Sequence, residues 1–291
     1  MNIKSRCIPC MVQQAYNAAT LATTDENKQK DIINEICELI PGIPETISPP
    51  ALSRKIQDIT VKHTGIKDPY KDIKEKNYNS TLRFVPYLKT YLESSKFPLE
   101  EAVRIAIAGN TIDLGANPDY DIDAEINKLS SNNIILDDFH SFKTDTEKAE
   151  TILYIADNLE ESIFDKLLIE KLQPKKIIYA VRSQPILNDI TLEDIPKTRI
   201  GSLCTIIESG SVIAGTILSN CSEEFLKIFN EADVVISKGQ GNFETLEDCQ
   251  REIYFLFKVK CEVIEKYCGH PIGKSILIKK GCKAYNNLIG N

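Results

Sequence analysis

The sequence predicts an α/β protein in two parts: a helical N-terminal region, residues 1–130, and an α/β domain, residues 131–291, built on a doubly wound, mostly parallel sheet. Three observations support this prediction. A chain of 291 residues has room for one large or two modest domains. Apolar residues recur at helical spacing in the first part, whereas short apolar runs alternate with helix-like segments in the second. That alternation is typical of a parallel sheet covered on both faces.

The clearest helix of the N-terminal region begins near Thr24 and ends before Pro41. Its first turn holds Asp25 and Glu26, which suit the positive end of a helix dipole, and a proline cannot continue a helix. Its apolar residues have helical spacing: Ile32, Ile33, Ile36, Leu39 and Ile40. Further helices are predicted over residues 10–21, 52–62, 78–93, 99–108 and 121–129.

Short apolar runs predict the strands, and none is expected before residue 134. They cover residues 134–136, 152–156, 177–181, 205–207, 234–236 and 254–259. In open α/β sheets, ligands bind beyond the carboxyl ends of the strands, near the point where the strand order reverses. The residues that directly follow these runs are therefore the first candidates for a functional site.

Composition and charge exclude several partners. The chain carries 35 Lys and Arg against 42 Asp and Glu, and an acidic surface repels a nucleic-acid backbone. No apolar run approaches the ~18 residues of a membrane span, and residues 1–20 lack the apolar core of a signal peptide. The nine cysteines, an odd number without secretory context, predict reduced thiols. These features predict a cytoplasmic protein with no nucleic acid or membrane partner, and they leave its oligomeric state open.

Oxygen-bearing side chains follow two of the predicted strands. Asp157 and Asn158 come directly after one run, and Asp189 lies 32 residues after Asp157, beyond the next run. That interval matches one strand–helix–strand unit, so both strand ends are expected at one edge of the sheet. An oxygen-only set suits Mg²⁺ or Mn²⁺. The alternative is that these are ordinary turn and N-cap residues, which the same residue types favour.

A glycine-rich segment follows the run at residues 234–236 and opens a predicted helix. It comprises Lys238, Gly239, Gln240, Gly241 and Asn242. Glycines allow close backbone approach, so exposed N–H groups, a helix N-terminus and the lysine charge together form a candidate phosphate site. The alternative is a simple loop with Asn242 as N-cap.

The sequence thus places metal ligands at two strand ends and anion-binding N–H groups at a third. This arrangement is typical of enzymes that transfer phosphoryl groups. Arg182 is a candidate forked contact to a phosphate oxygen, and Lys260 is a candidate point charge. The alternative for both is a solvated charge at a strand end.

Two further motifs have competing interpretations. The glycine-rich segment approaches a dinucleotide-binding fingerprint, but Glu244 stands in place of the third glycine, so a dinucleotide site is the weaker interpretation. Cys7 and Cys10 form a C-x-x-C ahead of a helix. We favour a structural role for them over a redox role, or over half of a metal site that Cys261 or Cys268 would complete.

In combination and in this order, several segments resemble the metal-dependent damage-control phosphatases, long catalogued as a domain of unknown function. The resemblance is strongest to their shorter branch with an N-terminal C-x-x-C, and it covers nearly the whole chain. The matching segments are residues 7–10, 109–113, 157–158 with Glu161, 182–189 with Thr191, 215–216, 237–244 and 257–261.

The resemblance implies a helical N-terminal part on a Rossmann-like α/β/α core. It also implies phosphatase activity on small phosphorylated metabolites, often sugar phosphates. A divalent metal ion, with Mn, Mg, Co or Ni as candidates, is implied at the positions of Asp157, Asn158 and Asp189. The substrate-binding positions that it implies are Asn110, Asp113, Lys238, Gly239, Gln240 and Lys260.

The chain departs from the family pattern at three positions. Glu160 stands where the family usually has glycine, Ser183 often corresponds to glycine, and Ala214 replaces a common proline. All three oxygen ligands are retained, so we expect activity. The extra negative charge of Glu160 is expected to alter metal choice or substrate range.

The sequence therefore predicts a metal-dependent phosphatase whose catalytic residues are Asp157, Asp189 and Lys238. The lysine and the N–H groups of residues 239–241 would neutralise charge in the transition state. The attacking oxygen is either water or an aspartate carboxylate, and both remain open. The alternatives are a carboxyl methyltransferase, an activity also described for the family, and a non-catalytic protein that binds a phosphometabolite.

Overall fold

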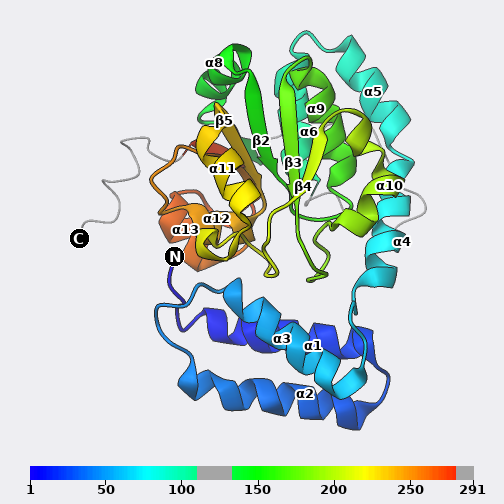
Figure 1. Cartoon of the computed structure of the whole chain (residues 1–291), viewed down its shortest axis with the longest axis vertical. Helices are drawn as coiled ribbons and strands as arrows, with labels where there is room; N and C mark the ends of the chain where they lie inside the picture. The colour runs from blue at the N-terminus through cyan, green and yellow to red at the C-terminus, as the bar shows by residue number, and fades with distance from the viewer. Residues whose placement is uncertain (110–132, 280–291) are drawn as a thin grey trace.

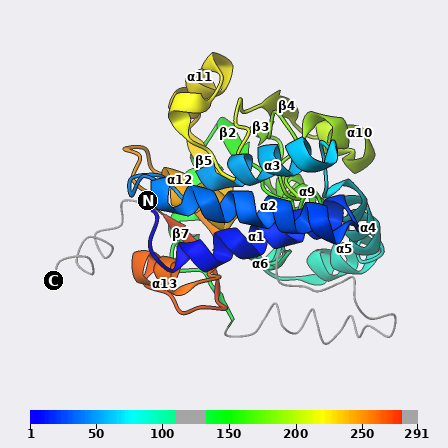
Figure 2. The ribbon, with the colours of Figure 1, turned by 90° about the horizontal axis from the view of Figure 1, so that it is seen from below.

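The computed structural model of the chain describes residues 1–109 and 133–279 (Figure 1). Its described residues form a seven-stranded sheet with helices on both faces. Three N-terminal helices lie across the end of the sheet where most strands have their carboxyl ends (Figures 1 and 2). This architecture confirms the predicted α/β class with a mostly parallel sheet.

The first three helices pack on one another around an apolar cluster of their own. They are α1 (Cys7–Ala22), α2 (Glu26–Leu39) and α3 (Ala51–Thr64). Asp25 caps α2, because its carboxylate accepts hydrogen bonds from the N–H groups of Asn27 and Lys28. Ile32 of α2 and Ile56 of α3 are buried between the helices.

The next three helices belong to the sheet rather than to this bundle. They are α4 (Lys71–Leu82), α5 (Val85–Ser94) and α6 (Pro98–Ala108). All three contribute to the apolar core on one face of the sheet. The single helix predicted over residues 78–93 is wrong, because Pro86 lacks an N–H and its ring clashes with the preceding turn, so α4 ends and α5 begins afresh. The predicted domain boundary near residue 130 lies outside the described residues.

The strands follow the predicted apolar runs, with one addition. They are β1 (Ile134–Ile135), β2 (Thr151–Ile155), β3 (Lys176–Val181), β4 (Thr205–Glu208), β5 (Val234–Lys238), β6 (Tyr254–Lys258) and β7 (Ser275–Lys279). The sequence did not predict β7, which pairs antiparallel to β6 and parallel to β1. The other strand pairs are parallel.

The strand order reverses in the middle of the sheet. The order is β1-β7-β6-β5-β2-β3-β4, so the chain runs outward from β2 to β4 and then returns to β5 on the other side of β2. The switch point therefore lies between β2 and β5. This is the position where open α/β sheets bind ligands.

Helices cover both faces of this sheet. The remaining α-helices are α8 (Phe139–Lys148), α9 (Ser162–Leu172), α10 (Ile195–Thr198), α11 (Glu223–Glu231), α12 (Gln240–Leu246) and α13 (Glu262–Cys268). The helix predicted over residues 121–129 lies outside the described residues. Among the helices that the structure describes, none has the length and apolar character needed to cross a bilayer.

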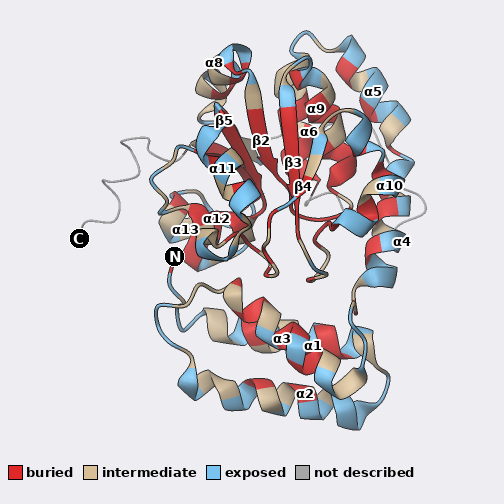
Figure 3. Ribbon diagram, in the orientation of Figure 1, coloured by how far each residue is buried: buried red, intermediate tan, exposed pale blue. Residues whose placement is uncertain are grey.

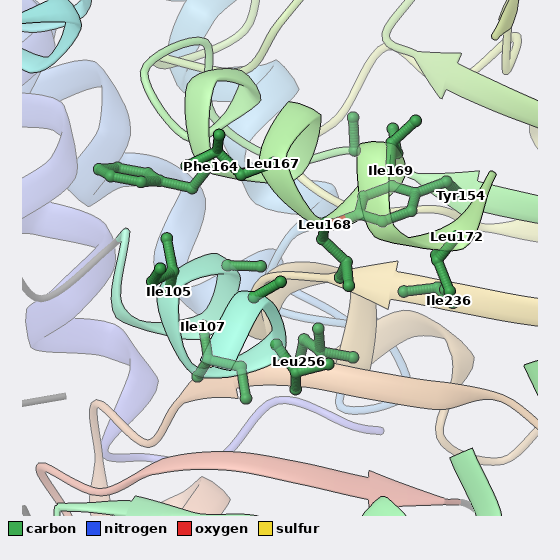
Figure 4. Close-up of a cluster of buried hydrophobic side chains, with 14 of the residues drawn as sticks. Ile105, Ile107, Tyr154, Phe164, Leu167, Leu168, Ile169, Leu172, Ile236 and Leu256 are labelled. Carbon is green, nitrogen blue, oxygen red and sulfur yellow. The ribbon is translucent and has the colours of Figure 1, made fainter. Parts of the chain in front are cut away.

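Two apolar clusters hold the layers together. On one face, Ile105 and Ile107 of α6 and Leu167 and Leu168 of α9 pack with Leu256 of β6 (Figure 4). On the other face, α11, α12 and α13 contribute the helical side of the cluster. Figure 3 shows the central strands buried and the outward helix surfaces exposed. The strand ends are thus fixed by a packed core on both sides.

Candidate functional site

The predicted oxygen ligands meet where β2 and β3 end. Beyond the paired strands, Asn158 and Asp189 face each other in an isolated antiparallel bridge. The N–H of Ile190 donates to the carbonyl of Asp157 at 2.9 Å. Backbone pairing therefore brings Asp157, Asn158 and Asp189 together at the switch point, as strand-end reasoning predicts.

The carboxylate of Asp157 lies against the glycine that follows β5. Gly239 has a φ of +82°, and a Cβ at that position would lie 2.1 Å from Asp157 Oδ2. Only a glycine accommodates both the backbone conformation and the close approach. Asp157 is 8% exposed, and its carboxylate accepts no hydrogen bond from the described residues. It is a buried acid that lacks a protein partner in that part of the chain.

The site holds a surplus of buried negative charge. Six buried ionisable side chains surround the candidate ligands: Asp157, Glu161, Asp165, Asp189, Arg182 and Lys238. Lys74 and Asp194, which are buried next to Asp189, pair with each other and add no net charge. Four acids and two bases give a formal charge of −2 when all are ionised. Burial raises the pKa of Asp157 well above its usual range, and Asp189 and Glu161 raise it further. This surplus, beside an unpaired carboxylate, fits a divalent cation with oxygen ligands.

Arg182 binds Asp189, one of these acids. It is 2% exposed, and its Nε donates to Asp189 Oδ2 at 2.7 Å. Its Nη1 donates to Thr216 Oγ1 and its Nη2 to Asn242 Oδ1, both at 2.9 Å. Burial raises the pKa of Asp189, and Arg182 opposes that rise. Because all three nitrogens donate to protein atoms, the geometry disfavours the predicted contact with phosphate and indicates that Arg182 orients Asp189.

Lys238 also points into the protein. It is 1% exposed, and its Nζ donates to Glu161 Oε2 at 2.8 Å and to Asp165 Oδ1 at 2.6 Å. Glu161 in turn accepts from Asn158 Nδ2 at 2.7 Å. This geometry disfavours the predicted direct contact of Lys238 with phosphate, because the amine already donates hydrogen bonds to two carboxylates.

The glycine-rich loop has the predicted turn from strand to helix. The N–H of Gly239 donates to Leu256 O at 3.0 Å, so it is already engaged. Gln240 and Gly241 open α12, where N–H groups have no acceptor within the helix. A Cβ on Gly241 would lie 2.1 Å from Ala214 O, so this glycine also permits close packing of the neighbouring loop.

A cavity of about 490 Å³ lies between α1 and the carboxyl edge of the sheet. Asn188, Gln240 and Lys260 line it from the sheet side, and Gln13 and Asn17 line it from α1. Asn188 directly precedes Asp189, and Gln240 directly follows Gly239, which lies against the Asp157 carboxylate. The cavity therefore brings amide side chains next to the candidate metal ligands.

The other predicted residues differ in their outcomes. Asn110 and Asp113 lie outside the described residues. Cys7 and Cys10 belong to the first turn of α1 and line the same cavity. Within residues 1–109 and 133–279, no three His, Cys, Asp or Glu side chains are placed to hold a metal ion, so a cysteine metal centre has no support there. The candidate set at the sheet contains two such side chains and an amide.

Glu160, the departure from the family pattern, is half-buried beside the site. One of its carboxyl oxygens accepts from Asn188 Nδ2 at 2.9 Å. The other, Oε2, is buried without a hydrogen-bond partner in the described structure. Burial raises the pKa of Glu160 to about 7.

Sequence reasoning assigned no supporting role to three residues that hold the site together. Thr216 and Asn242 accept hydrogen bonds from Arg182. Asn242 was considered only as a possible N-cap, but Gly239 is the N-cap and Asn242 lies inside α12. Asp165 binds Lys238. One signal for Asp165 was available, since it is an acid on the apolar face of a helix, between Phe164 and Leu168.

These features define a class of protein: a three-layer α/β fold whose switch point holds an acidic cluster that suits a cation, next to a cavity with amide and apolar side chains in its lining. The sequence profile of the family described as "Damage-control phosphatase ARMT1-like domain" matches residues 3–276. The chain therefore belongs to the ARMT1-like damage-control phosphatase family, and the family resemblance is confirmed.

Named relatives agree with this assignment. The chain is 32% identical to a damage-control phosphatase of Pyrococcus horikoshii, over 97% of this chain and 100% of that protein. It is 33% identical to an uncharacterised protein of Methanocaldococcus jannaschii, over 96% of each chain. A crystal structure of a DUF89 family protein from Pyrococcus horikoshii superposes with a TM-score of 0.88, at 32% identity, over 96% of this chain and 99% of that one. The family description and the name of the first of these relatives support a phosphatase role.

Proposed function

We propose that the chain is a metal-dependent phosphatase that hydrolyses small phosphorylated metabolites, such as sugar phosphates, in the cytoplasm. In this proposal Asp157, Asn158 and Asp189 hold one divalent cation. The observation that carries it is the buried Asp157 carboxylate, which lacks a partner among the described residues although it lies in a cluster with a formal charge of −2. A divalent cation would neutralise that surplus.

The protein's own residues would position the substrate. The N–H groups of Gln240 and Gly241, at the start of α12, point their partial positive charge toward an incoming phosphate. Lys260, at the rim of the cavity, would add a full charge. When bound, the cation would polarise the phosphoryl group and offset the charge that develops on its oxygens. Water enters overall, the bond from phosphorus to the ester oxygen breaks, and inorganic phosphate and an alcohol leave.

The cavity offers polar groups to a substrate within a mostly apolar lining. Its amide side chains from α1 and from the sheet are suited to hydroxyl groups, which both donate and accept hydrogen bonds. A volume of about 490 Å³ lies in the usual range for small-molecule sites. Sugar phosphates combine many hydroxyls with one phosphate and therefore match both parts of the site.

The geometry also bears on the attacking oxygen. Asp189 Oδ2 accepts from Arg182, whereas the Asp157 carboxylate accepts nothing from the described residues. If the first step is covalent, Asp157 is therefore the carboxylate better placed to attack. Trapping a phosphorylated enzyme on Asp157 during brief exposure to substrate would establish that route, and its absence during turnover would favour water.

The test is phosphate release from a panel of sugar phosphates and p-nitrophenyl phosphate, with Mg²⁺, Mn²⁺, Co²⁺, Ni²⁺ or EDTA. We expect metal-dependent release by the wild type and none by Asp157→Ala. Asp145→Asn, a change at α8 away from the site, is the control and should retain activity. Release that continues in EDTA would contradict metal dependence. Folded protein that releases no phosphate with any metal would favour the binding protein or the methyltransferase.

A further inference from the structure

A buried chain of polar contacts runs from the candidate ligand Asn158 into the core. Asn158 Nδ2 donates to Glu161 Oε1 at 2.7 Å. Lys238 Nζ joins the other oxygen of Glu161, at 2.8 Å, to Asp165 Oδ1, at 2.6 Å. The side chains of Glu161, Lys238 and Asp165 are each at most 1% exposed. Solvent therefore supplies none of the hydrogen-bond partners in this series of contacts.

Two tyrosines fix the inner end. Tyr154 OH donates to Asp165 Oδ1 at 2.6 Å, and Tyr179 OH donates to Asp165 Oδ2 at 2.9 Å. Their rings stack with centroids 5.4 Å apart, and they come from the adjacent strands β2 and β3. Figure 4 shows Tyr154 among the apolar side chains beneath α9. The carboxylate of Asp165 is thus held at both oxygens by side chains of two central strands of the sheet.

At the outer end of this series of contacts, Glu161 determines which way the amide of Asn158 faces. An amide presents an NH₂ group at one end and an oxygen at the other, and only the oxygen can bind a cation. Glu161 accepts from Lys238 at one oxygen and from the NH₂ end of the Asn158 amide at the other, so the amide oxygen faces away from Glu161. Burial lowers the pKa of Lys238, but Asp165 and Glu161 raise it by more, so the amine stays charged beside Glu161.

Stability alone does not account for these groups. A buried ion pair contributes little net stability, because desolvation offsets the Coulomb attraction. Here one lysine faces two carboxylates, which leaves a surplus of negative charge. That surplus is unfavourable in an isolated core and favourable beside a bound cation.

We propose that Glu161, Lys238 and Asp165 are positioning residues that hold the amide oxygen of Asn158 toward the metal ion. The inference rests on the proposed function. It adds to that function a series of hydrogen bonds that connects the sheet core to the candidate metal ligand. None of the three residues touches the reacting atoms. Their effect passes through the orientation of a single amide.

The test is Mn²⁺ binding to metal-free protein, measured by calorimetry, for the wild type, Glu161→Gln and Asp165→Asn. A glutamine at 161 keeps the shape but turns an NH₂ group toward either Lys238 or Asn158, so a donor meets a donor and the Asn158 amide rotates. We expect Mn²⁺ to bind Glu161→Gln about 10- to 100-fold more weakly, the usual effect of removing a residue that orients a metal ligand. Asp165→Asn should also weaken binding, because Lys238 loses an anchor.

Exchanging the donor and the acceptor between positions 158 and 161 provides a second test of the amide orientation. The double variant N158D/E161Q has the same formal charge as the wild type. It restores a donor opposite an acceptor, with the NH₂ group now on the side chain at 161. It should bind Mn²⁺ more tightly than E161Q alone. Failure to recover any affinity would overturn the orientation argument.

Asp145 offers a matched control. It accepts from Tyr254 OH at 2.5 Å and from Lys279 Nζ at 3.1 Å, the same two kinds of partner that Asp165 has. Asp145→Asn should leave the Mn²⁺ affinity at the wild-type value. Thermal unfolding of each metal-free variant separates the roles, since a merely structural group lowers the melting temperature without changing the affinity.

The outcomes distinguish this inference from the proposed function. If the wild type binds Mn²⁺ and folded E161Q and D165N bind it equally well, the positioning role is refuted and the metal site stands. If the wild type binds no divalent cation at all, both are refuted.

Discussion

Replacing Gly239 by alanine tests whether the position of Asp157 controls the chemistry. Gly239 has φ +82° and ψ 152°, a region that almost only glycine occupies, so alanine there costs about 1–3 kcal/mol of backbone strain. In addition, the new Cβ would lie 2.1 Å from Asp157 Oδ2, whereas ordinary contact begins at 3.4 Å. The carboxylate would have to retreat by about 1 Å.

A displacement of that size is large for a catalytic group. Misplacing a reacting group by about 1 Å costs roughly 100-fold in rate. We therefore expect Gly239→Ala to lower kcat/KM for phosphate release by about 100-fold or more and to weaken Mn²⁺ binding. Urea denaturation should show destabilisation of about 1–3 kcal/mol.

Gly65 provides the control for backbone strain alone. It ends α3 with φ +75°, and a Cβ there would meet nothing within 4 Å. Gly65→Ala should cost about 1 kcal/mol of stability and leave the rate unchanged. A folded Gly239→Ala variant with wild-type rate and Mn²⁺ affinity would refute the reasoning, because Asp157 could then move without consequence.

Three further predictions concern charge. Burial raises the pKa of Asp157, so at about pH 8 folding must either bury an ionised carboxylate or protonate it, and Asp157→Asn should stabilise the metal-free protein. The same change should abolish the roughly 2.7 kcal/mol that Mn²⁺ at 100 times its Kd adds to the wild type. Thermal unfolding with and without Mn²⁺ measures both effects. Arg182→Ala should cost about 3–5 kcal/mol in urea denaturation, because Asp189 is left buried without its cation; a loss below about 1 kcal/mol would contradict this. Burial raises the pKa of Glu244 from 4.5 to about 7, so this group favours the folded state at low pH and loses that contribution as the pH rises toward 7. Glu244→Gln should therefore gain stability relative to metal-free wild type between about pH 5 and pH 8, by up to about 3 kcal/mol, and a constant difference would refute the shift.

Much of the fold could be predicted because its signals are local. Buried parallel strands are continuous apolar runs, and the six expected runs each contain a strand. The seventh strand, Ser275–Lys279, was missed because it follows a glycine-containing segment that looks like a loop and because it reverses direction, which the alternation of strand and helix does not anticipate. The break between α4 and α5 was predictable from Pro86, whose effect on a helix is known.

The site was predictable only in part. Asp157, Asn158 and Asp189 were brought together by the rule that parallel strands end at one edge. The direction of Lys238 was not predictable, because its partners Glu161 and Asp165 lie more than 70 residues earlier in the chain. A lysine beside a glycine-rich loop gives no sign of whether its amine faces a ligand or the core. Arg182 poses the same problem, since two of its three partners, Thr216 in a loop and Asn242 in α12, lie 34 and 60 residues further along the chain.

The cavity between α1 and the sheet has an evolutionary consequence. The candidate oxygen ligands lie just beyond strands that are fixed by the sheet core, whereas one wall of the cavity comes from a bundle with its own separate core. Substitutions along α1 at Gln13 or Asn17 would reshape what the pocket accepts without disturbing the groups that perform the reaction. Proteins with this architecture can therefore change the substrate they accept through substitutions on one surface of α1, while the residues that carry out the reaction stay the same.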